Sequence, residues 1–343
     1  MQDPRQDTRT VILQGETWAV DAAPPKPKLP RTFFQTSLGD ILRCIIYMVG
    51  LWVLPALVSA WVYYYTALPM PLQITIYLMM GWLSGHGMVW GEWIGHDAVH
   101  GSLLPKHKKL GLFITLMTSS VILGFMNMGF AARHLDHHRY TNRATDPDTA
   151  HYTKYQGVLG KLLLARAHKN LTYIYAAYLA FRGDPHHMPP GYTLREIRWL
   201  VVANAVFVIF WIATYAIIAV HSIPLFMFFV LLPTVSLIAA TGALTYQQHG
   251  GTGGADPSDP WRTTRSMTSW LWTFLYGGGG FHLEHHLYPL VPFFNLPKVH
   301  RYLKEQGYFR LRGVPLDNDS FGGYKYFSSR YPYPEPEVRQ PAA

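Results

Sequence analysis

Histidines gather in three five-residue windows, and their spacing is the first feature of the chain that could do chemistry. The windows HDAVH, HLDHH and HLEHH hold eight of the 17 histidines, namely His96, His100, His134, His137, His138, His282, His285 and His286. Residues at i, i+3 and i+4 share one face of a helix, so each window can direct its imidazoles toward a common point. Neutral imidazole binds iron, copper, zinc and nickel. The windows are therefore predicted to bind metal.

The number of histidines distinguishes between kinds of metal site. A structural zinc site closes with about four ligands, whereas eight or nine histidines would supply two metal ions with several ligands each. The ninth candidate is His249, which directly follows a long apolar run. The count favours a binuclear centre with open positions for a small molecule over histidines that merely lie on solvated helix faces.

Acidic residues inside the windows, Asp97, Asp136 and Glu284, are predicted to surround the ligands rather than to bind metal. A carboxylate that accepts the distal imidazole N–H sets the tautomer and the direction of the ring. Asn142 and the DPD sequence at 146–148 follow the second window. A turn or helix cap is expected there, and a polar contact to the site is the alternative.

The segments that must position these histidines have the composition of a membrane protein. Of 343 residues, 49% are apolar and 14% are charged, against about 25% charged in soluble domains. Five runs without an ionised side chain have roughly the 20 residues needed to cross a bilayer core. They are 44–66, 72–91, 111–130, 199–220 and 222–246.

The distribution of basic residues predicts the orientation of these runs. All 29 Lys and Arg lie in 1–43, 92–198 and 247–343, which the positive-inside bias assigns to the cytoplasm. The net charge of +9 then reflects topology and anionic lipid headgroups rather than nucleic acid. All three windows reach one side of the membrane only if 111–130 does not cross, so this run is predicted to be interfacial or re-entrant.

The predicted fold is an all-α integral membrane protein. It has two transmembrane helical hairpins (four spans), the interfacial or re-entrant helix, and a cytoplasmic helical cap that carries the di-metal site. Residues 1–35 are predicted to be a disordered cytoplasmic N-terminal tail, 36–312 the membrane domain, and 313–343 a C-terminal tail.

The pattern HxxxH, HxxHH and HxxHH, with a two-span hairpin before the last window, resembles the integral-membrane fatty acid desaturase and hydroxylase superfamily. The resemblance covers roughly residues 40–310, and FHLEHHLYPLVPFFNLPKVHRYLKE is particularly similar to bacterial acyl-chain desaturases. It implies two Fe ions in a non-haem diiron centre and O2 as co-substrate. It also implies a bacterial inner-membrane location with the active site facing the cytoplasm. The implied ligands are the eight window histidines, with His249 as the ninth.

The leading functional hypothesis is an O2-dependent desaturase that introduces a double bond into a long-chain acyl lipid. The alternatives are a carotenoid ketolase or hydroxylase, or an alkyl-chain hydroxylase or decarboxylase of the same superfamily. HLDHHRYTNRATDPD also resembles carotenoid ketolases, but YQQH stands where their Leu-Pro-His-type sequence is expected, which favours the acyl-chain interpretation. A metal transporter without oxygen chemistry would need ionisable residues within the spans, and the five runs offer only His86.

The resemblance also implies a separate electron donor, because no His-Pro-Gly-Gly haem motif occurs in the sequence. A ferredoxin or cytochrome would have to dock on the protein, and basic residues would attract an acidic donor. The candidate basic residues are Lys106, Lys108, Lys109, Lys298, Arg301 and Lys304, for which lipid headgroups are the alternative partner. An apolar substrate tunnel, or alternatively an interfacial aromatic belt, would include Met80, Trp82, Trp90, Trp93, Trp270 and Trp272.

Overall fold

Helices make up nearly all of the secondary structure in this computed structural model, which confirms the predicted all-α class. The structure describes residues 10–13, 16–19, 26–143, 145–148, 152–155, 157–250, 252 and 259–311. Within these ranges the strands are a short antiparallel pair, β1 (Thr10–Leu13) and β2 (Glu16–Ala19), with Thr10 opposite Ala19. This pair lies inside the segment predicted to be a disordered tail. The predicted tail at 313–343 lies outside the described residues, and the domain boundaries stay predictions.

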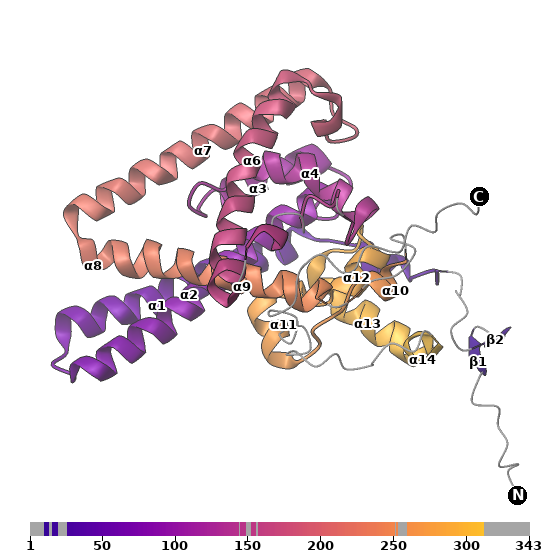
Figure 1. Cartoon of the computed structure of the whole chain (residues 1–343), viewed down its shortest axis with the longest axis horizontal. Coiled ribbons are helices and arrows are strands. Elements are labelled where there is room, and N and C mark those ends of the chain that lie inside the picture. Colours follow the sequence, from indigo (N-terminus) through magenta and orange to yellow (C-terminus); the bar gives the residue numbers. More distant parts are fainter. Residues whose placement is uncertain are drawn as a thin grey trace, which may run out of the picture.

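Two antiparallel helix pairs extend to the left in Figure 1. The first pair is α1 (Leu38–Tyr65) and α2 (Met70–His100), which pack along each other. The second is α7 (Leu194–His221) and a nearly continuous helix whose parts are α8 (Ile223–Phe226), η5 (Met227–Leu231) and α9 (Leu232–His249).

Within the described part of the chain, three helical segments have the length and apolarity needed to cross a membrane: Leu38–Tyr65, Leu194–His221 and Ile223–His249. The predicted fourth span, α2, has 31 residues but does not join them. Its apolar run carries Gln73, Ser84 and His86, which lower its hydropathy. Three of the four predicted spans thus have the properties of a membrane-crossing helix, and the total of four stays a prediction.

The run 111–130 does not form one helix. It divides between α3 (Lys108–Ser119) and α4 (Asn127–Tyr140), and at about 1.5 Å per residue each piece is shorter than the roughly 30 Å hydrocarbon core. Asn204 of α7 satisfies polar groups at the break: its amide oxygen accepts from the Met128 backbone N–H at 3.0 Å, and its amide nitrogen donates to Ser120 Oγ at 3.1 Å. The break explains how α4 turns back, while the interfacial or re-entrant position stays a prediction.

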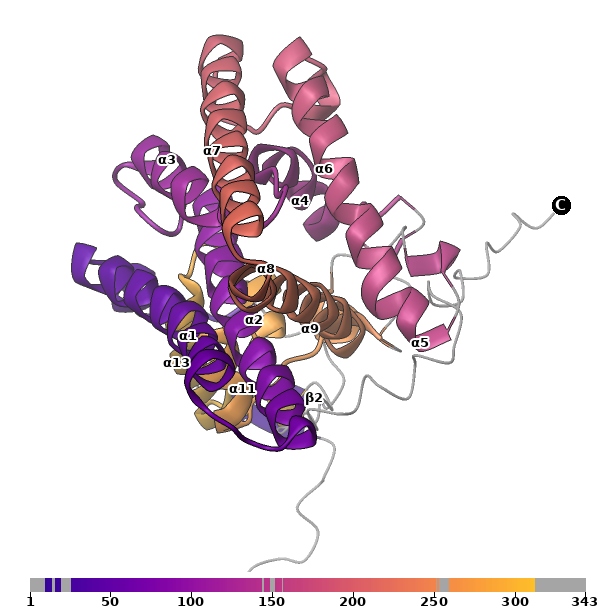
Figure 2. The same ribbon diagram turned by 90° about the vertical axis from the view of Figure 1, so that its left-hand side faces the viewer.

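A close helix crossing holds α4 in place. The connection after α4 contains η2 (Tyr152–Lys154), α5 (Gly157–Leu159), η3 (Gly160–Leu164), α6 (Ala165–Arg182) and η4 (Pro185–His187). Helix α6 packs beside α4 and α7 (Figure 2). At the crossing, a Cβ on Gly129 would lie 1.7 Å from the carbonyl oxygen of Tyr173. Glycine is therefore required for this approach of α6 to the second histidine window.

The C-terminal helices form a cap beside the ends of α2 and α9 (Figure 1). The Asp97 carboxylate near the end of α2 ties the cap to the hairpin, because it accepts from the Phe293 backbone N–H at 2.7 Å. Phe293 is completely buried in the main apolar core. The remaining helical elements are η1 (Arg31–Phe34), α10 (Pro260–Thr263), α11 (Trp270–Tyr276), α12 (His282–Leu287), η6 (Phe293–Asn295), α13 (Leu296–Glu305) and α14 (Tyr308–Leu311).

Candidate metal centre

All nine predicted histidines meet in two neighbouring groups beside the cap. Within each group, the nitrogens that could bind metal lie within 4.8 Å of one another. One group is His96, His100, His134, His138 and His285, and the other is His137, His249, His282 and His286. Eight of these side chains are at most 9% exposed. Helices α2, α4, α9 and α12 therefore converge on two potential metal positions.

The same helices supply histidines to both groups. Helix α4 gives His134 and His138 to the first group and His137 to the second, and α12 likewise divides its histidines. The rings of His138 and His286, which belong to different groups, stack with centroids 4.2 Å apart. Two separate sites do not need this sharing, whereas a binuclear centre does.

The spacing of the ring nitrogens fits bound metal ions. The Nε2 atoms of His249 and His282 are 2.9 Å apart, and those of His285 and His138 are 3.0 Å apart. A metal–nitrogen bond of about 2.1 Å places two ligands at right angles about 3.0 Å apart. Further, the buried Nε2 atoms of His96 and His100 have no hydrogen-bond partner among the described residues.

Hydrogen bonds at the far side of two rings direct their lone pairs into the groups. His249 donates from Nδ1 to the Thr263 carbonyl oxygen at 3.0 Å, and His137 donates from Nδ1 to the two carboxylate oxygens of Asp146 at 2.9 and 3.0 Å. A proton on Nδ1 leaves an Nε2 lone pair for a metal. The Nε2 lone pairs of His249 and His137 are thereby available to a metal ion.

Burial keeps most of these imidazoles in the form that metal binding needs. It lowers the pKa of His134, His138, His285 and His286 well below the ordinary value, so these rings are neutral at pH 7. Burial also acts to lower the pKa of His137, but the Asp146 and Asp148 carboxylates outweigh it and raise that pKa. The second group thus has one electron-rich imidazole, held by carboxylates outside it.

The acidic residues inside the windows make few contacts with the histidines that they were predicted to orient. Asp97 Oδ1 is 3.5 Å from His96 Nδ1, a marginal contact. Glu284 accepts from His300 Nδ1 at 2.6 Å and from Ser266 Oγ, so it anchors α12 to α13 instead of orienting a window histidine.

Asp136 points away from the histidine groups. Its carboxylate pairs with Arg139 at 3.4 Å and is partly exposed. The reason is helical geometry, since a residue two positions after His134 lies on the opposite face of α4. The predicted role of Asp136 beside a ligand therefore has no support in the structure.

The DPD sequence provides the carboxylates that do contact the groups. Besides holding His137, Asp146 accepts from the backbone N–H groups of Asn142 and Asp148 at 2.9 and 2.8 Å. Asp148 Oδ2 lies 3.5 Å from His134 Nδ1. The expected turn and the alternative, a polar contact to the site, are thus both present. Asn142 also donates to the Thr263 carbonyl oxygen at 3.0 Å, the same atom that accepts from His249.

Replacement of Asp146 with asparagine is expected to weaken metal binding and turnover about 10- to 100-fold, the range typical of outer carboxylates. The amide keeps the shape of the side chain but removes the charge that makes His137 a stronger ligand. Metal content measured by mass spectrometry and turnover should fall together. Asp136→Asn, a matched change on the outer face of α4, should leave both unchanged. Equal behaviour of the two variants would contradict the assignment of Asp146.

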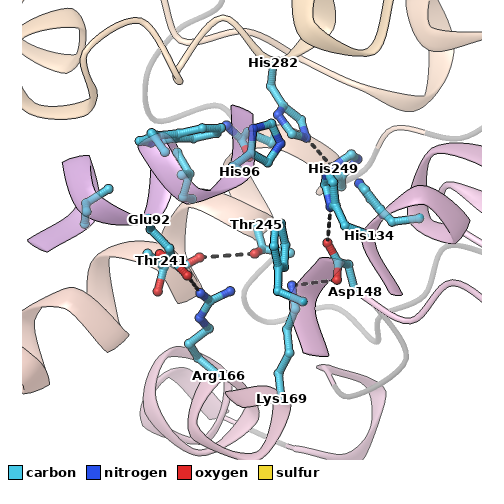
Figure 3. A pocket seen from close by; sticks show the side chains of 16 residues that line it. Glu92, His96, His134, Asp148, Arg166, Lys169, Thr241, Thr245, His249 and His282 are labelled. Atoms are coloured by element: carbon cyan, nitrogen blue, oxygen red, sulfur yellow. Dashed lines mark hydrogen bonds and ion pairs between the residues drawn. The ribbon is translucent and has the colours of Figure 1, made fainter. Parts of the chain in front are cut away.

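A cavity of about 80 Å³ opens beside the histidines. Figure 3 shows His96, His134, His249 and His282 at one side and Glu92, Arg166 and Lys169 at the other. The last three are not predicted from the sequence. A local signal exists only for Glu92, which stands one helical turn before His96 on the same face. The positions of Arg166 and Lys169 depend on how α6 crosses α4.

A second cavity, of about 320 Å³, lies farther along α2 and α9 toward the apolar hairpins. Its lining includes Trp82 and His86 of α2, Ala240 of α9, and Trp272 of α11. The same two helices, α2 and α9, thus line both cavities. Among the predicted tunnel residues, Trp82, Trp93 and Trp272 line the cavities, whereas Trp270 is 79% exposed.

Comparison with known proteins places this geometry in a family. A family model described as "Fatty acid desaturase" matches residues 71–315, which include both histidine groups. A protein named "Beta-carotene ketolase" from Paracoccus sp. (strain N81106 / MBIC 01143) is 28% identical over 279 residues, covering 80% of this chain and 95% of that protein. Another "Beta-carotene ketolase", from Paracoccus sp. (strain PC1), is 28% identical over 211 residues, which cover 61% of this chain and 72% of that protein. With its family match spanning most of its length, its apolar helices and its paired histidine groups, the chain belongs to the fatty acid desaturase family of membrane oxidoreductases.

Proposed function

We propose that the nine histidines hold two iron ions and that the protein uses O2 to oxidise an unactivated C–H bond in a long apolar lipid. The observation that carries the proposal is the pair of adjoining groups, which offer five and four imidazole nitrogens. Iron supplies the oxidising chemistry when bound. The chain supplies neutral ligands, outer carboxylates at Asp146 and Asp148, and a position for the substrate.

The cavities account for how a membrane lipid would reach the site. A chain entering between α2 and α9 would pass Trp82 and Trp272 and end beside Trp93, which packs against His96 with ring centroids 4.9 Å apart. Apolar walls bind a hydrocarbon and exclude water from the site. Rigid helices on both sides would hold one carbon near the metals, as selective C–H oxidation requires.

Desaturation of an acyl chain is the first candidate reaction. The family description supports it, as does the apolar path from the spanning helices. The reaction removes two hydrogens from adjoining carbons. In this candidate the substrate is a long-chain acyl lipid drawn from the membrane.

Oxygen insertion into a carotenoid is the second candidate, because the ketolase from strain N81106 aligns with 80% of this chain. The sequence YQQH at His249 departs from the Leu-Pro-His type, yet His249 joins the second group all the same. The departure therefore does not separate the two candidates. Other hydroxylations, and decarboxylation, use the same kind of site.

Mass spectrometry of lipids and pigments from a host that expresses the chain tests the proposal. Loss of two hydrogens in acyl chains identifies a desaturase, and gain of oxygen in a carotenoid identifies a ketolase or hydroxylase. A host that makes both substrate classes is needed, and cells expressing the His137→Ala variant provide the background. An unchanged pool with iron-loaded protein and a working reductant would refute the function.

Electrons are proposed to come from a separate ferredoxin or cytochrome on the cytoplasmic side of a bacterial inner membrane. Lys106 and Lys298 support this, because both are exposed and line one surface depression beside the cap. An acidic donor would be attracted there. Lys109, in contrast, pairs with Glu196 and contributes less free charge.

A further inference from the structure

Two largely buried ion pairs line the cavity, from the side opposite the histidines to Asp148, which contacts His134. Arg166 pairs with Glu92, and Lys169 pairs with Asp148 at 3.0 Å. Arg166 and Lys169 are 6% and 3% exposed, and both lie on the inner face of α6, three residues apart. The wall, which we call the polar wall (Glu92, Asp148, Arg166 and Lys169), is polar but has no net charge (Figure 3).

One donor of the polar wall is unused. Arg166 Nε is buried and has no hydrogen-bond partner among the described residues, and the Arg166 side chain lines the cavity. Arginine donates hydrogen bonds and accepts none, so this N–H requires an acceptor. Thr241 and Thr245 line the same cavity and donate to the Leu237 carbonyl at 2.8 Å and the Thr241 carbonyl at 3.1 Å, but neither hydroxyl oxygen accepts from Arg166 Nε in the structure.

A purely structural role does not account for every feature of the polar wall. The Arg166–Glu92 pair does link α6 to α2, and the Lys169–Asp148 pair links α6 to the turn behind His134. Apolar side chains of similar volume often serve such links at least as well, because buried charges lose hydration. A structural link also gives no reason for the buried Arg166 Nε–H to lack an acceptor among the described residues, because an unmet buried donor is costly.

We propose that the polar wall is a subsite for an oxygen function of the lipid, with Arg166 Nε–H donating to a carbonyl or hydroxyl oxygen. This inference rests on the proposed function, because it orients the lipid in that same site. Arg166 lines the same cavity of about 80 Å³ as His96 and His134, so the bound oxygen lies on the part of the lipid nearest the histidines. The substrate class is then a long apolar lipid with an oxygen-bearing reactive end. A plain methylene chain would leave the wall unsatisfied.

Lipid binding to the purified full chain, loaded with iron and kept without O2 and reductant, tests the subsite. The probes are β-carotene and the same polyene with one ring carbonyl, titrated by quenching of tryptophan fluorescence. The wild type should bind the carbonyl-bearing polyene about tenfold or more tightly, as one hydrogen bond to a charged donor provides. The double variant Glu92→Gln/Arg166→Gln, which keeps a neutral hydrogen-bonding pair, should lose this preference.

The surface pair Lys109–Glu196 provides the matched control. Lys109→Gln/Glu196→Gln removes the same charges away from the cavity, and glutamine preserves the capping box at the start of α7, so the preference should persist. Arg166→Lys, which keeps the ion pair but lacks the planar donor fork, should reduce the preference in a protein with full iron content.

Equal affinity of the wild type for both polyenes would overturn the subsite. So would an equal loss of affinity for both polyenes in the Arg166 variants, which would reveal a structural role. The proposed function is judged separately, from the cellular product analysis. A preference that depends on Arg166 supports the subsite even if neither polyene is oxidised.

Discussion

Replacement of His285 with alanine should abolish turnover and reduce the iron content from two ions per chain toward one. His285 belongs to the five-histidine group, and its Nε2 atom is 3.0 Å from that of His138. The four-histidine group keeps all its members in this variant. We expect turnover to fall by more than about a hundredfold, since loss of a ligand exceeds the effect of losing an outer carboxylate. Iron analysis and product yield from purified protein measure the two effects.

Two further variants make the result specific. His282→Ala removes a ligand from the other group and should leave a different single iron with a different spectroscopic signature. His107→Ala changes an exposed histidine at the start of α3 and should retain iron and turnover. A His285→Ala protein with full iron content and normal turnover would remove His285 from the site.

The histidines of the site could be predicted from the sequence because helical spacing is a local property. His134, His137 and His138 share a face of α4 whatever surrounds that helix. The division of the α4 histidines between two groups could not be predicted, because it depends on where α2, α9 and α12 approach α4. The same spacing rule, applied strictly, places Asp136 on the outer face, so sequence proximity alone was a poor guide there.

The break between α3 and α4 had a local signal that hydropathy does not register. Ser119, Ser120 and Asn127 interrupt an otherwise apolar run, and all three are buried. Their hydrogen-bonding groups need partners in an apolar environment, and Asn204 on α7 provides one of them. Hydropathy gives the length of a run, but these polar groups decide whether its backbone continues as one helix.

The polar wall could not be predicted because its residues come from separate parts of the fold. Arg166 and Glu92 are far apart in the sequence and meet only because α6 crosses α4 at Gly129. In the sequence, ARAHKN carries two basic residues and a histidine, and it lies in a region that is predicted to be cytoplasmic, so nothing local indicates that its charges are buried. Buried charge at such a position becomes visible only when the helices are packed.

Removal of the metals should separate their structural contribution from their chemical one. A strong chelator is expected to lower the melting temperature and abolish turnover, because the apo protein leaves the buried Nε2 atoms of His96 and His100 without a hydrogen-bond partner among the described residues. A metal that binds only the folded state stabilises it by mass action. Zinc, which also accepts imidazole nitrogen, should restore the melting temperature. Ferrous iron should restore both properties.

The zinc-loaded protein decides between oxygen chemistry and simple metal binding. Zinc has no redox chemistry, so it should fill the histidine groups and leave C–H bonds unchanged. Thermal unfolding, metal content and product analysis on one protein preparation follow all three states. Turnover by the zinc-loaded or chelated protein would refute an iron-dependent oxidation. If the melting temperature did not depend on metal in any state, the two groups would be ordinary core histidines, and the convergence of α2, α4, α9 and α12 would need another explanation.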